Sequence, residues 1–300
     1  MASEQIERVR NHWQAQAEAR EQPSLEEMRL YDDYWAALTG EPADTDYIQE
    51  TVGGVPGLWA VPKDAPDHAA IIAFHGGGFI TGSPYSHRKM YGHIAEASGT
   101  RVFIPRYRLA PEHGFPSQLE DAEAVYRELL SRLGSADRLL IAGDSAGGGL
   151  ALALLVKLRD GGVALPSGAM VLSAWTDMEL GGASYETNAA KDPVFRREMV
   201  DQLVHMVMGP EPDRRNPYAS PLHADLSGLP PVYLQAGGDE GIVDDSIEFA
   251  RRAQQAGVDA TLDVFPEMLH SFQMAAGRAP EADDAVARLG AWAHGRLRNV

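Results

Sequence analysis

A serine at the centre of a glycine-bounded turn is the strongest chemical signal in this sequence. The pentapeptide Gly-Asp-Ser-Ala-Gly at residues 143–147 follows a largely apolar run at 138–142 and precedes a second one at 148–156. This order predicts a strand, a sharp turn and a helix, with Ser145 at the turn. Such a turn requires small residues two positions before and after the serine, and both are glycine here. Ser145 is therefore a candidate nucleophile at a helix N-terminus, where developing negative charge is stabilised.

A glycine-rich loop supplies the second signal. The apolar run at 69–74 is typical of a buried parallel strand and ends in His-Gly-Gly-Gly-Phe at residues 75–79. Three glycines leave a backbone whose N–H groups can point at a ligand oxygen, such as the oxyanion formed in acyl transfer. A phosphate-binding loop is the alternative. It is disfavoured because the sequence lacks G-x-x-x-x-G-K-[ST] and has no Lys or Arg inside the loop.

A serine nucleophile needs a general base, and that base needs a carboxylate to orient it. Downstream of Ser145, the apolar run at 231–236 is followed by two glycines and Asp239. The alternating run at 260–265 leads into His270 a few residues later. Both residues follow predicted strands, and a doubly wound sheet gathers its functional groups at the carboxyl ends of its strands. Asp239 is therefore the predicted acid and His270 the predicted base.

Other side chains compete for these two roles. Glu240 is the next candidate for the acid, whereas Asp244 and Asp245 have the position of first-turn residues of a following helix, where carboxylates complement the helix dipole. Among the other histidines, His205 is predicted to be packed in an apolar helical stretch. The remaining ones considered lie beside a helix, in a loop or without a strand end before them: His87, His93, His113, His223 and His294.

These motifs, together with Tyr-Arg-Leu-Ala-Pro-Glu-His at 107–113, resemble the bacterial hormone-sensitive-lipase-like esterases, also called family IV. The resemblance runs from about Val55 to the C-terminus. It implies an α/β-hydrolase fold, with a central, mostly parallel sheet flanked by helices and covered by a helical cap. By position it assigns the nucleophile to Ser145, the acid to Asp239 and the base to His270. It also implies that the oxyanion donors are the backbone N–H groups of Gly77, Gly78 and Ala146.

The chemistry expected from these assignments is hydrolysis of short- to medium-chain carboxylic esters through an acyl-enzyme intermediate. It needs no metal and no organic cofactor. A lactone or amide hydrolase using the same three residues is an open alternative. A non-catalytic ligand-binding protein of this fold is disfavoured because the predicted triad and the glycine loop are both intact.

Composition limits the remaining function classes. The chain has 300 residues, no cysteine and a formal net charge of −17, which disfavours nucleic acid and anionic membranes as partners. It contains no apolar run of 18 or more residues, so no membrane span is expected. The first residues are acidic and polar and do not resemble a secretory signal, so a cytoplasmic location is expected.

The organisation along the chain predicts a catalytic core interrupted by an insertion. Residues 46–176 and 227–300 show the strand–helix alternation of the core. Residues 177–226 break this alternation between the sixth and seventh strands, and with the helical residues 1–45 they are predicted to form the cap. The strand at 260–265 is the last in sequence and should lie at a sheet edge, where relatives often pair, so a homodimer is expected.

Overall fold

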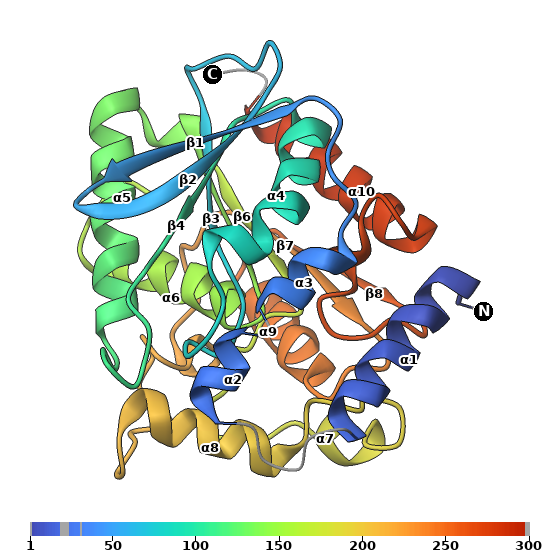
Figure 1. The fold of residues 1–300 in the computed structure, drawn as a ribbon. Helices are drawn as coiled ribbons and strands as arrows, with labels where there is room; N and C mark the ends of the chain where they lie inside the picture. Colours follow the sequence, from blue (N-terminus) through green and yellow to red (C-terminus); the bar gives the residue numbers. More distant parts are fainter. Residues whose placement is uncertain (1, 19–23, 31, 298–300) are drawn as a thin grey trace.

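The computed structural model describes residues 2–18, 24–30 and 32–297. Its centre is an eight-stranded sheet in the order β1-β2-β4-β3-β5-β6-β7-β8 (Figure 1). β2 pairs antiparallel with both β1 and β4, and every other neighbouring pair is parallel. The strands are β1 (Thr45–Val52), β2 (Val55–Pro62), β3 (Ala70–Phe74), β4 (Val102–Pro105), β5 (Leu139–Asp144), β6 (Gly168–Leu172), β7 (Val232–Gly237) and β8 (Ala260–Phe265). The predicted mostly parallel α/β sheet is confirmed.

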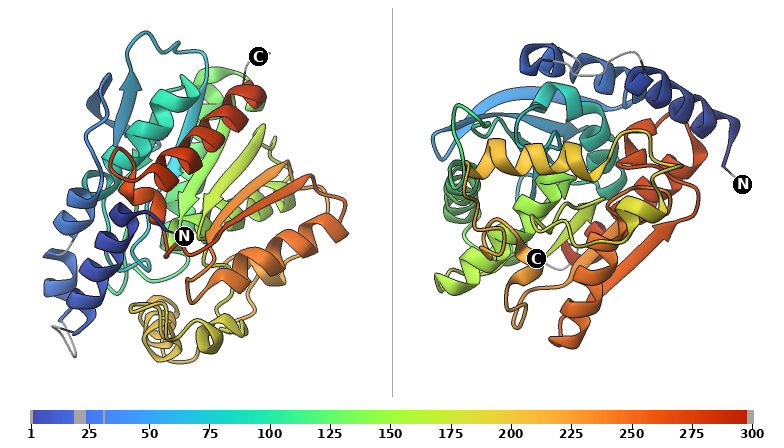
Figure 2. Two further views of the ribbon diagram at one scale, coloured as in Figure 1. Left: turned by 90° about the vertical axis from the view of Figure 1, so that its right-hand side faces the viewer. Right: turned by 90° about the horizontal axis from the view of Figure 1, so that it is seen from below.

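Helices cover both faces of this sheet (Figure 2). α4 and α10 pack against each other on one face, and α5, α6 and α9 cover the other. The helices are α1 (Glu4–Glu18), α2 (Leu25–Leu30), α3 (Asp32–Leu38), α4 (Pro84–Ser98), α5 (Ser117–Leu133), α6 (Ala146–Asp160), α7 (Ser184–Thr187), α8 (Arg197–Met208), α9 (Val243–Gln255) and α10 (Pro280–Leu297). Short 3₁₀ turns lie at Ala136–Arg138, Pro221–His223 and Phe272–Ala275.

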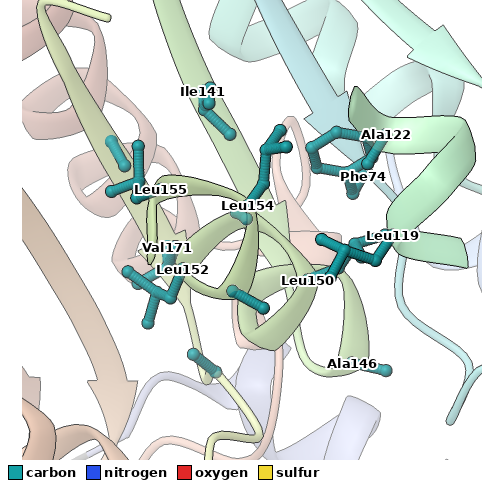
Figure 3. Packing of buried hydrophobic residues seen from close by; sticks show 14 of the residues in the cluster. Phe74, Leu119, Ala122, Ile141, Ala146, Leu150, Leu152, Leu154, Leu155 and Val171 are labelled. Atoms are coloured by element: carbon teal, nitrogen blue, oxygen red, sulfur yellow. The ribbon is translucent and has the colours of Figure 1, made fainter. Parts of the chain in front are cut away.

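The central strands are buried along their whole length because helices cover both of their faces. Figure 3 shows Phe74, Ile141 and Val171, from three neighbouring strands, packed near leucines of α6. α6 is itself buried on almost every side. This packing fixes the start of α6, and with it the turn that carries Ser145.

α4 has clear start and stop signals. The Ser83 hydroxyl accepts a hydrogen bond from the N–H of Ser86, and the Ser86 hydroxyl accepts one from the N–H of Ser83, which forms a capping box. Pro84 occupies the first turn, and the helix ends at Gly99, whose φ is +64°. These signals fix α4, which carries His87 and Tyr91 toward the edge of the glycine loop.

The long connection between β6 and β7 falls where the sequence predicts an insertion, and it contains α7 and α8. Figure 1 shows α2, α7 and α8 together at the lower end of the molecule. Seen from below, α8 crosses that end, with α1 to one side (Figure 2). The helical region predicted near the N-terminus comprises α1, α2 and α3, while residues 19–23 and 31 lie outside the described residues.

Two further sequence expectations concern the outside of the molecule. β8 lies at one edge of the sheet, as predicted, and β1 lies at the other. Among the helices that the structure describes, none combines the length and the apolar character that a membrane crossing requires.

Candidate active site

The turn between β5 and α6 presents Ser145 in a strained backbone conformation. Its φ and ψ are 54° and −124°, a region that non-glycine residues rarely adopt. A Cβ atom on Gly147 would lie 2.0 Å from the carbonyl oxygen of Phe74, and one on Gly143 would lie 2.1 Å from the carbonyl oxygen of Gly147. Only glycine fits at both positions, so the predicted requirement for small residues is confirmed.

The glycine loop lies beside this turn. Gly77 and Gly78 have φ values of 113° and 61°, and both line one cavity together with Ser145 and His270. Ala146 is buried and is the first residue of α6. Within the described part of the chain, the backbone N–H groups of Gly77, Gly78 and Ala146 donate no hydrogen bond. Three unpaired amides near a serine hydroxyl are suited to binding a negatively charged oxygen.

A buried carboxylate connects the glycine loop to the serine turn. Asp144 Oδ1 accepts hydrogen bonds from the N–H of Gly76 and from the Tyr91 hydroxyl, each at 2.9 Å. His87 Nε2 lies 3.4 Å from Asp144 Oδ2. Burial opposes ionisation of Asp144, but His87 and the hydrogen bonds outweigh it and hold the pKa of this carboxyl below its usual value. Because Asp144 precedes Ser145, this contact ties the glycine loop to the serine turn.

His75 supports the glycine loop structurally and has no expected role in the reaction. Its ring stacks on Tyr107 with 4.2 Å between ring centroids, and its Nδ1 lies 2.8 Å from the carbonyl oxygen of Gly76. Complete burial, and secondly repulsion from His87, lowers the pKa of His75 to about 3. The imidazole is therefore neutral at physiological pH and acts as a packed, uncharged part of the loop.

His270 pairs with Glu240. Its Nδ1 lies 2.8 Å from Glu240 Oε2, and both side chains are buried. Because a carboxylate accepts hydrogen bonds, Nδ1 carries the proton in this pair and Nε2 is left as the basic atom. Nε2 has no hydrogen-bond partner among the described residues, and the His270 side chain lines the cavity that contains Ser145. An unpaired basic nitrogen in the same cavity as a serine hydroxyl is a candidate general base.

The structure does not bring Asp239 to His270, contrary to the prediction. Asp239 pairs instead with Arg10 of α1 at 3.1 Å and with Lys191 of the insertion at 3.0 Å. Glu240 lies one residue further along the turn, and its longer side chain folds back so that Oε1 accepts the N–H of Gly237 at 3.2 Å. Glu240 is the second candidate for the acid in the sequence analysis. The basic groups that pair with Asp239 are distant in sequence, so no local signal separated the two carboxylates.

The other competing carboxylates both lie in the first turn of α9, as predicted. Asp244 is partly buried and accepts a hydrogen bond from the N–H of Ser184 at 2.9 Å. Asp245 is only 2% exposed, and it accepts the N–H groups of Thr176 and Asp177 at 2.7 and 2.9 Å. The interpretation of Asp245 as an ordinary helix-start charge was therefore incomplete, since it also holds the chain that leaves β6.

The histidines outside the site divide between packing and surface. The prediction that His205 is packed is wrong, since its side chain is 44% exposed on α8. The buried face of this helix is formed by other, apolar residues. His93 is partly buried, with its Nε2 3.0 Å from the carbonyl oxygen of Gly40. Neither residue lines the cavity beside Ser145.

The cavity beside Ser145 measures about 110 Å³ and is largely apolar. Met28 and Trp35 line it from the N-terminal helices, and Phe195, Met199 and Leu203 line it from the insertion. The Phe195 ring also packs on the His270 imidazole, with 3.9 Å between ring centroids. Segments distant in sequence thus enclose the serine, as a substrate pocket that excludes water requires.

One group outside this cavity has the side chains of a metal site. In the part of the chain that the structure describes, Asp177, Glu179 and His223 place ligand atoms within 4.8 Å of one another. The Asp177 carboxylate already accepts the N–H groups of Glu179 and Gly181 and lies 2.9 Å from His223 Nε2. These contacts explain why the three side chains lie together without a metal, and we assign no metal to them.

Comparison with known proteins identifies the family. The family model described as alpha/beta hydrolase fold matches residues 71–274. The chain is 37% identical over 242 residues to an acetyl-hydrolase of Streptomyces hygroscopicus, a match that covers 81% of this chain and 80% of that protein. It is 33% identical over 223 residues to an esterase of Acinetobacter venetianus, covering 74% of each chain.

Solved structures give the same result over almost the whole length. An esterase from the bacterial hormone-sensitive lipase family matches with a TM-score of 0.95 and 38% identity, covering 99% of both chains. A hormone-sensitive lipase from a metagenome library matches with a TM-score of 0.92 and 34% identity, also covering 99% of both chains. The fold, the serine turn and these similarities agree, and the chain belongs to the α/β-hydrolase family as a carboxylic-ester hydrolase of the bacterial hormone-sensitive-lipase-like group.

Proposed function

We propose that this enzyme hydrolyses short- to medium-chain carboxylic esters through an acyl-enzyme intermediate formed on Ser145. His270 Nε2 takes the proton of the serine hydroxyl as its oxygen attacks the ester carbonyl carbon. The resulting imidazolium then protonates the departing alcohol. Water repeats the sequence on the acyl-enzyme, with His270 again acting first as base and then as acid, and releases the carboxylic acid.

The acid of this triad is Glu240. The observation that carries the proposal is the buried pair of His270 Nδ1 and Glu240 Oε2 at 2.8 Å, combined with an unpaired Nε2 in a side chain that lines the cavity of Ser145. Glu240 fixes the tautomer of the imidazole and stabilises the imidazolium that forms during attack.

The oxyanion of each tetrahedral intermediate binds to the backbone amides of Gly77, Gly78 and Ala146. Their positions beside Ser145, and the lack of other acceptors for them among the described residues, support this assignment. Loss of one donor in such a site typically slows the chemical step about 10²–10³-fold. Asp144 holds the loop that carries two of these amides through its bond to Gly76.

The size of the cavity supports a preference for small acyl groups. Its volume of about 110 Å³ is well below the roughly 300–1,000 Å³ of pockets that enclose drug-sized ligands. Two relatives carry names that agree with this, the acetyl-hydrolase of Streptomyces hygroscopicus and an ethyl acetate hydrolase of Pseudomonas putida, which is 30% identical over 76% of this chain. Residues 1–45 and 177–226 act together as the cap that limits the depth of the pocket.

A substrate panel tests this proposal. p-Nitrophenyl esters of increasing acyl length, small lactones and small amides are compared by kcat/KM with the wild-type chain and with Ser145→Ala. The expected result is highest activity on short acyl esters and complete loss in the variant, with circular dichroism unchanged. Mass spectrometry should detect an acyl adduct on wild type alone. Substantial turnover by Ser145→Ala would disprove the assignment of the nucleophile. Faster turnover of lactones or amides than of esters would show that the proposed substrate class is wrong.

We further propose that two copies of the chain associate through β8. This strand is a sheet edge, and Val264 on it is 38% exposed. Exposed edges either carry features that block pairing or are covered by a partner.

A further inference from the structure

The turn that carries Glu240 is held by a segment of the insertion. We define the acid loop as residues 237–241 and the supporting segment as residues 184–195. Ser184 donates a hydrogen bond from its hydroxyl to the carbonyl oxygen of Gly241 at 2.7 Å. Asp192, only 2% exposed, accepts the N–H of the same glycine at 2.7 Å. The acid loop is therefore fixed by side chains that lie about fifty residues away in sequence.

Asn188 makes the contact closest to the acid itself. Its side-chain amide donates to the carbonyl oxygens of Gly238 and Glu240, each at 3.0 Å, and the residue is 8% exposed. These carbonyls belong to the peptides before Asp239 and after Glu240, so one NH₂ group spans the turn and restrains both peptide planes. The orientation of these planes sets the direction in which the Glu240 side chain leaves the backbone.

These two carbonyl oxygens accept few other hydrogen bonds. Gly238 O accepts from no donor other than Asn188 among the described residues, and Glu240 O also accepts the N–H of Val243 at a longer 3.4 Å. With Asn188 removed, the partly buried carbonyl of Gly238 would lose its partner. The bonds of Ser184 and Asp192 to Gly241 would remain, but the peptide planes that set the direction of the Glu240 side chain would be held less tightly.

The same segment also reaches the base. Asp192 accepts the N–H of Phe195 at 3.0 Å through Oδ1 while its Oδ2 holds Gly241. Phe195 packs on the His270 ring. Residues 184–195 thus contact both partners of the hydrogen bond between Glu240 and His270, although they supply neither of them.

We propose that Asn188 is a positioning residue that holds Glu240 in line with His270, so that the insertion takes part in catalysis as well as in enclosing the substrate. This inference rests on the proposed function of Glu240 as the acid. It assigns a role to a residue that touches no substrate. Its effect should therefore appear in kcat, with little change in KM.

A double-mutant cycle separates this role from a purely structural one. The variants are Asn188→Ala, Glu240→Gln and the two combined, with Asn216→Ala as a matched control. Asn216 belongs to the same insertion, and its side chain accepts the N–H of Tyr218 instead of bonding to the acid loop. Asn188→Ala should lower kcat about ten- to hundredfold, because small misplacements of a catalytic group have effects of this size. The control should stay within about twofold of wild type.

The decisive comparison is in the Glu240→Gln background. There, removal of Asn188 should cost less than about twofold in kcat, because residues that act through one group are not additive. An equal loss in both backgrounds would overturn the inference and leave Glu240 as the acid. If Glu240→Gln alone leaves kcat unchanged, the proposed acid is wrong and the inference falls with it. Should Asn188→Ala fail to fold by circular dichroism, Asn188→Ser replaces it in the same cycle with the same expectations.

Discussion

Asp239 and Glu240 are adjacent carboxylates with different partners. Asp239 lies between Arg10 and Lys191 near the surface, and Glu240 is buried against His270. Glu240→Gln should lower kcat about 10²–10⁴-fold, because an amide stabilises neither the required tautomer nor the imidazolium. Asp239→Asn should change kcat by less than about threefold, because Asp239 pairs with Arg10 and Lys191 and not with the imidazole that takes the proton. The kcat values of both variants decide the assignment, and a crippled Asp239→Asn beside an active Glu240→Gln would reverse it.

Asp245 allows a prediction about stability and pH. Burial, with repulsion from Asp177 also contributing, raises the pKa of Asp245 well above its usual value despite two backbone hydrogen bonds. For a carboxyl with a raised folded-state pKa, the stabilisation is complete below the unfolded pKa of about 4 and is lost as pH rises through the folded value. Asp245→Asn remains neutral, and its amide oxygen can still accept both N–H groups.

The wild type should therefore lose more stability than Asp245→Asn between about pH 5 and about pH 8. Urea unfolding at both pH values measures the two free energies of unfolding. A difference between the proteins that does not change with pH would contradict a raised pKa of Asp245 in the folded state.

The residues that the sequence identified best are those fixed by local geometry. The position of Ser145 at a sharp turn could be predicted because the turn constrains its neighbours to glycine within five positions. The position of His270 near the serine could be predicted because it follows a strand with clear alternation. The carboxylate that pairs with His270 was predicted wrongly because the choice between Asp239 and Glu240 depends on contacts with Arg10, Lys191 and Asn188, which come from other parts of the chain.

At the scale of elements, α8 sets one wall of the cavity. Leu203 lies beside the glycine loop, so close that a Cβ atom on Gly78 would come within 2.8 Å of Leu203 Cδ1. Leu203→Ala should lengthen the pocket and raise the kcat/KM ratio of hexanoate to acetate esters about tenfold, since a few methylene groups in an apolar pocket have effects of this order.

Val207→Ala is the matched control for this prediction. Val207 is also buried on α8, at 3% exposed, but it does not line the cavity beside Ser145. Val207→Ala shortens a buried side chain of α8 without enlarging the pocket. The dependence of kcat/KM on acyl length should therefore stay as in wild type. Equal shifts in both variants would indicate a general loosening of α8 and not a lengthened pocket.

Most elements could be placed from hydrophobic periodicity, because buried strands and amphipathic helices carry their signal in consecutive residues. β8 matches its predicted bounds, and the insertion falls between β6 and β7 as expected. The internal contacts of the insertion could not be predicted. Ser184, Asn188 and Asp192 are short polar residues in irregular backbone, and nothing in their own neighbourhood reveals that their partners lie in the acid loop.

At the scale of the whole molecule, the proposed pairing through β8 can be tested with the opposite sheet edge as reference. Light scattering should give twice the chain mass of 32.5 kDa for wild type. Val264→Lys on β8 should give a monomer, whereas Ile48→Lys should remain a dimer, because Ile48 is 54% exposed on β1. A monomeric wild type, or equal behaviour of the two variants, would contradict the pairing.

The net charge of −17 per chain adds a condition to this prediction. Two copies repel each other at long range, and salt screens that repulsion within about 10 Å at 0.1 M ionic strength. The dimer fraction should therefore rise with salt at fixed protein concentration. The α/β architecture of the whole molecule could be predicted from the sequence. The association of two copies could not, because the sequence pattern shows only that β8 lies at a sheet edge and not whether a partner covers it.

The hydrogen bonds from residues 184–195 to the acid loop have a consequence for engineering. Exchanging the insertion between relatives is an obvious way to alter substrate range, since it lines the pocket. In this enzyme such a graft would also remove Ser184, Asn188 and Asp192, and with them the support of Glu240. A chimera that keeps these three side chains should acquire the donor's selectivity at near-native turnover, and one that replaces them should bind the new substrate but process it slowly.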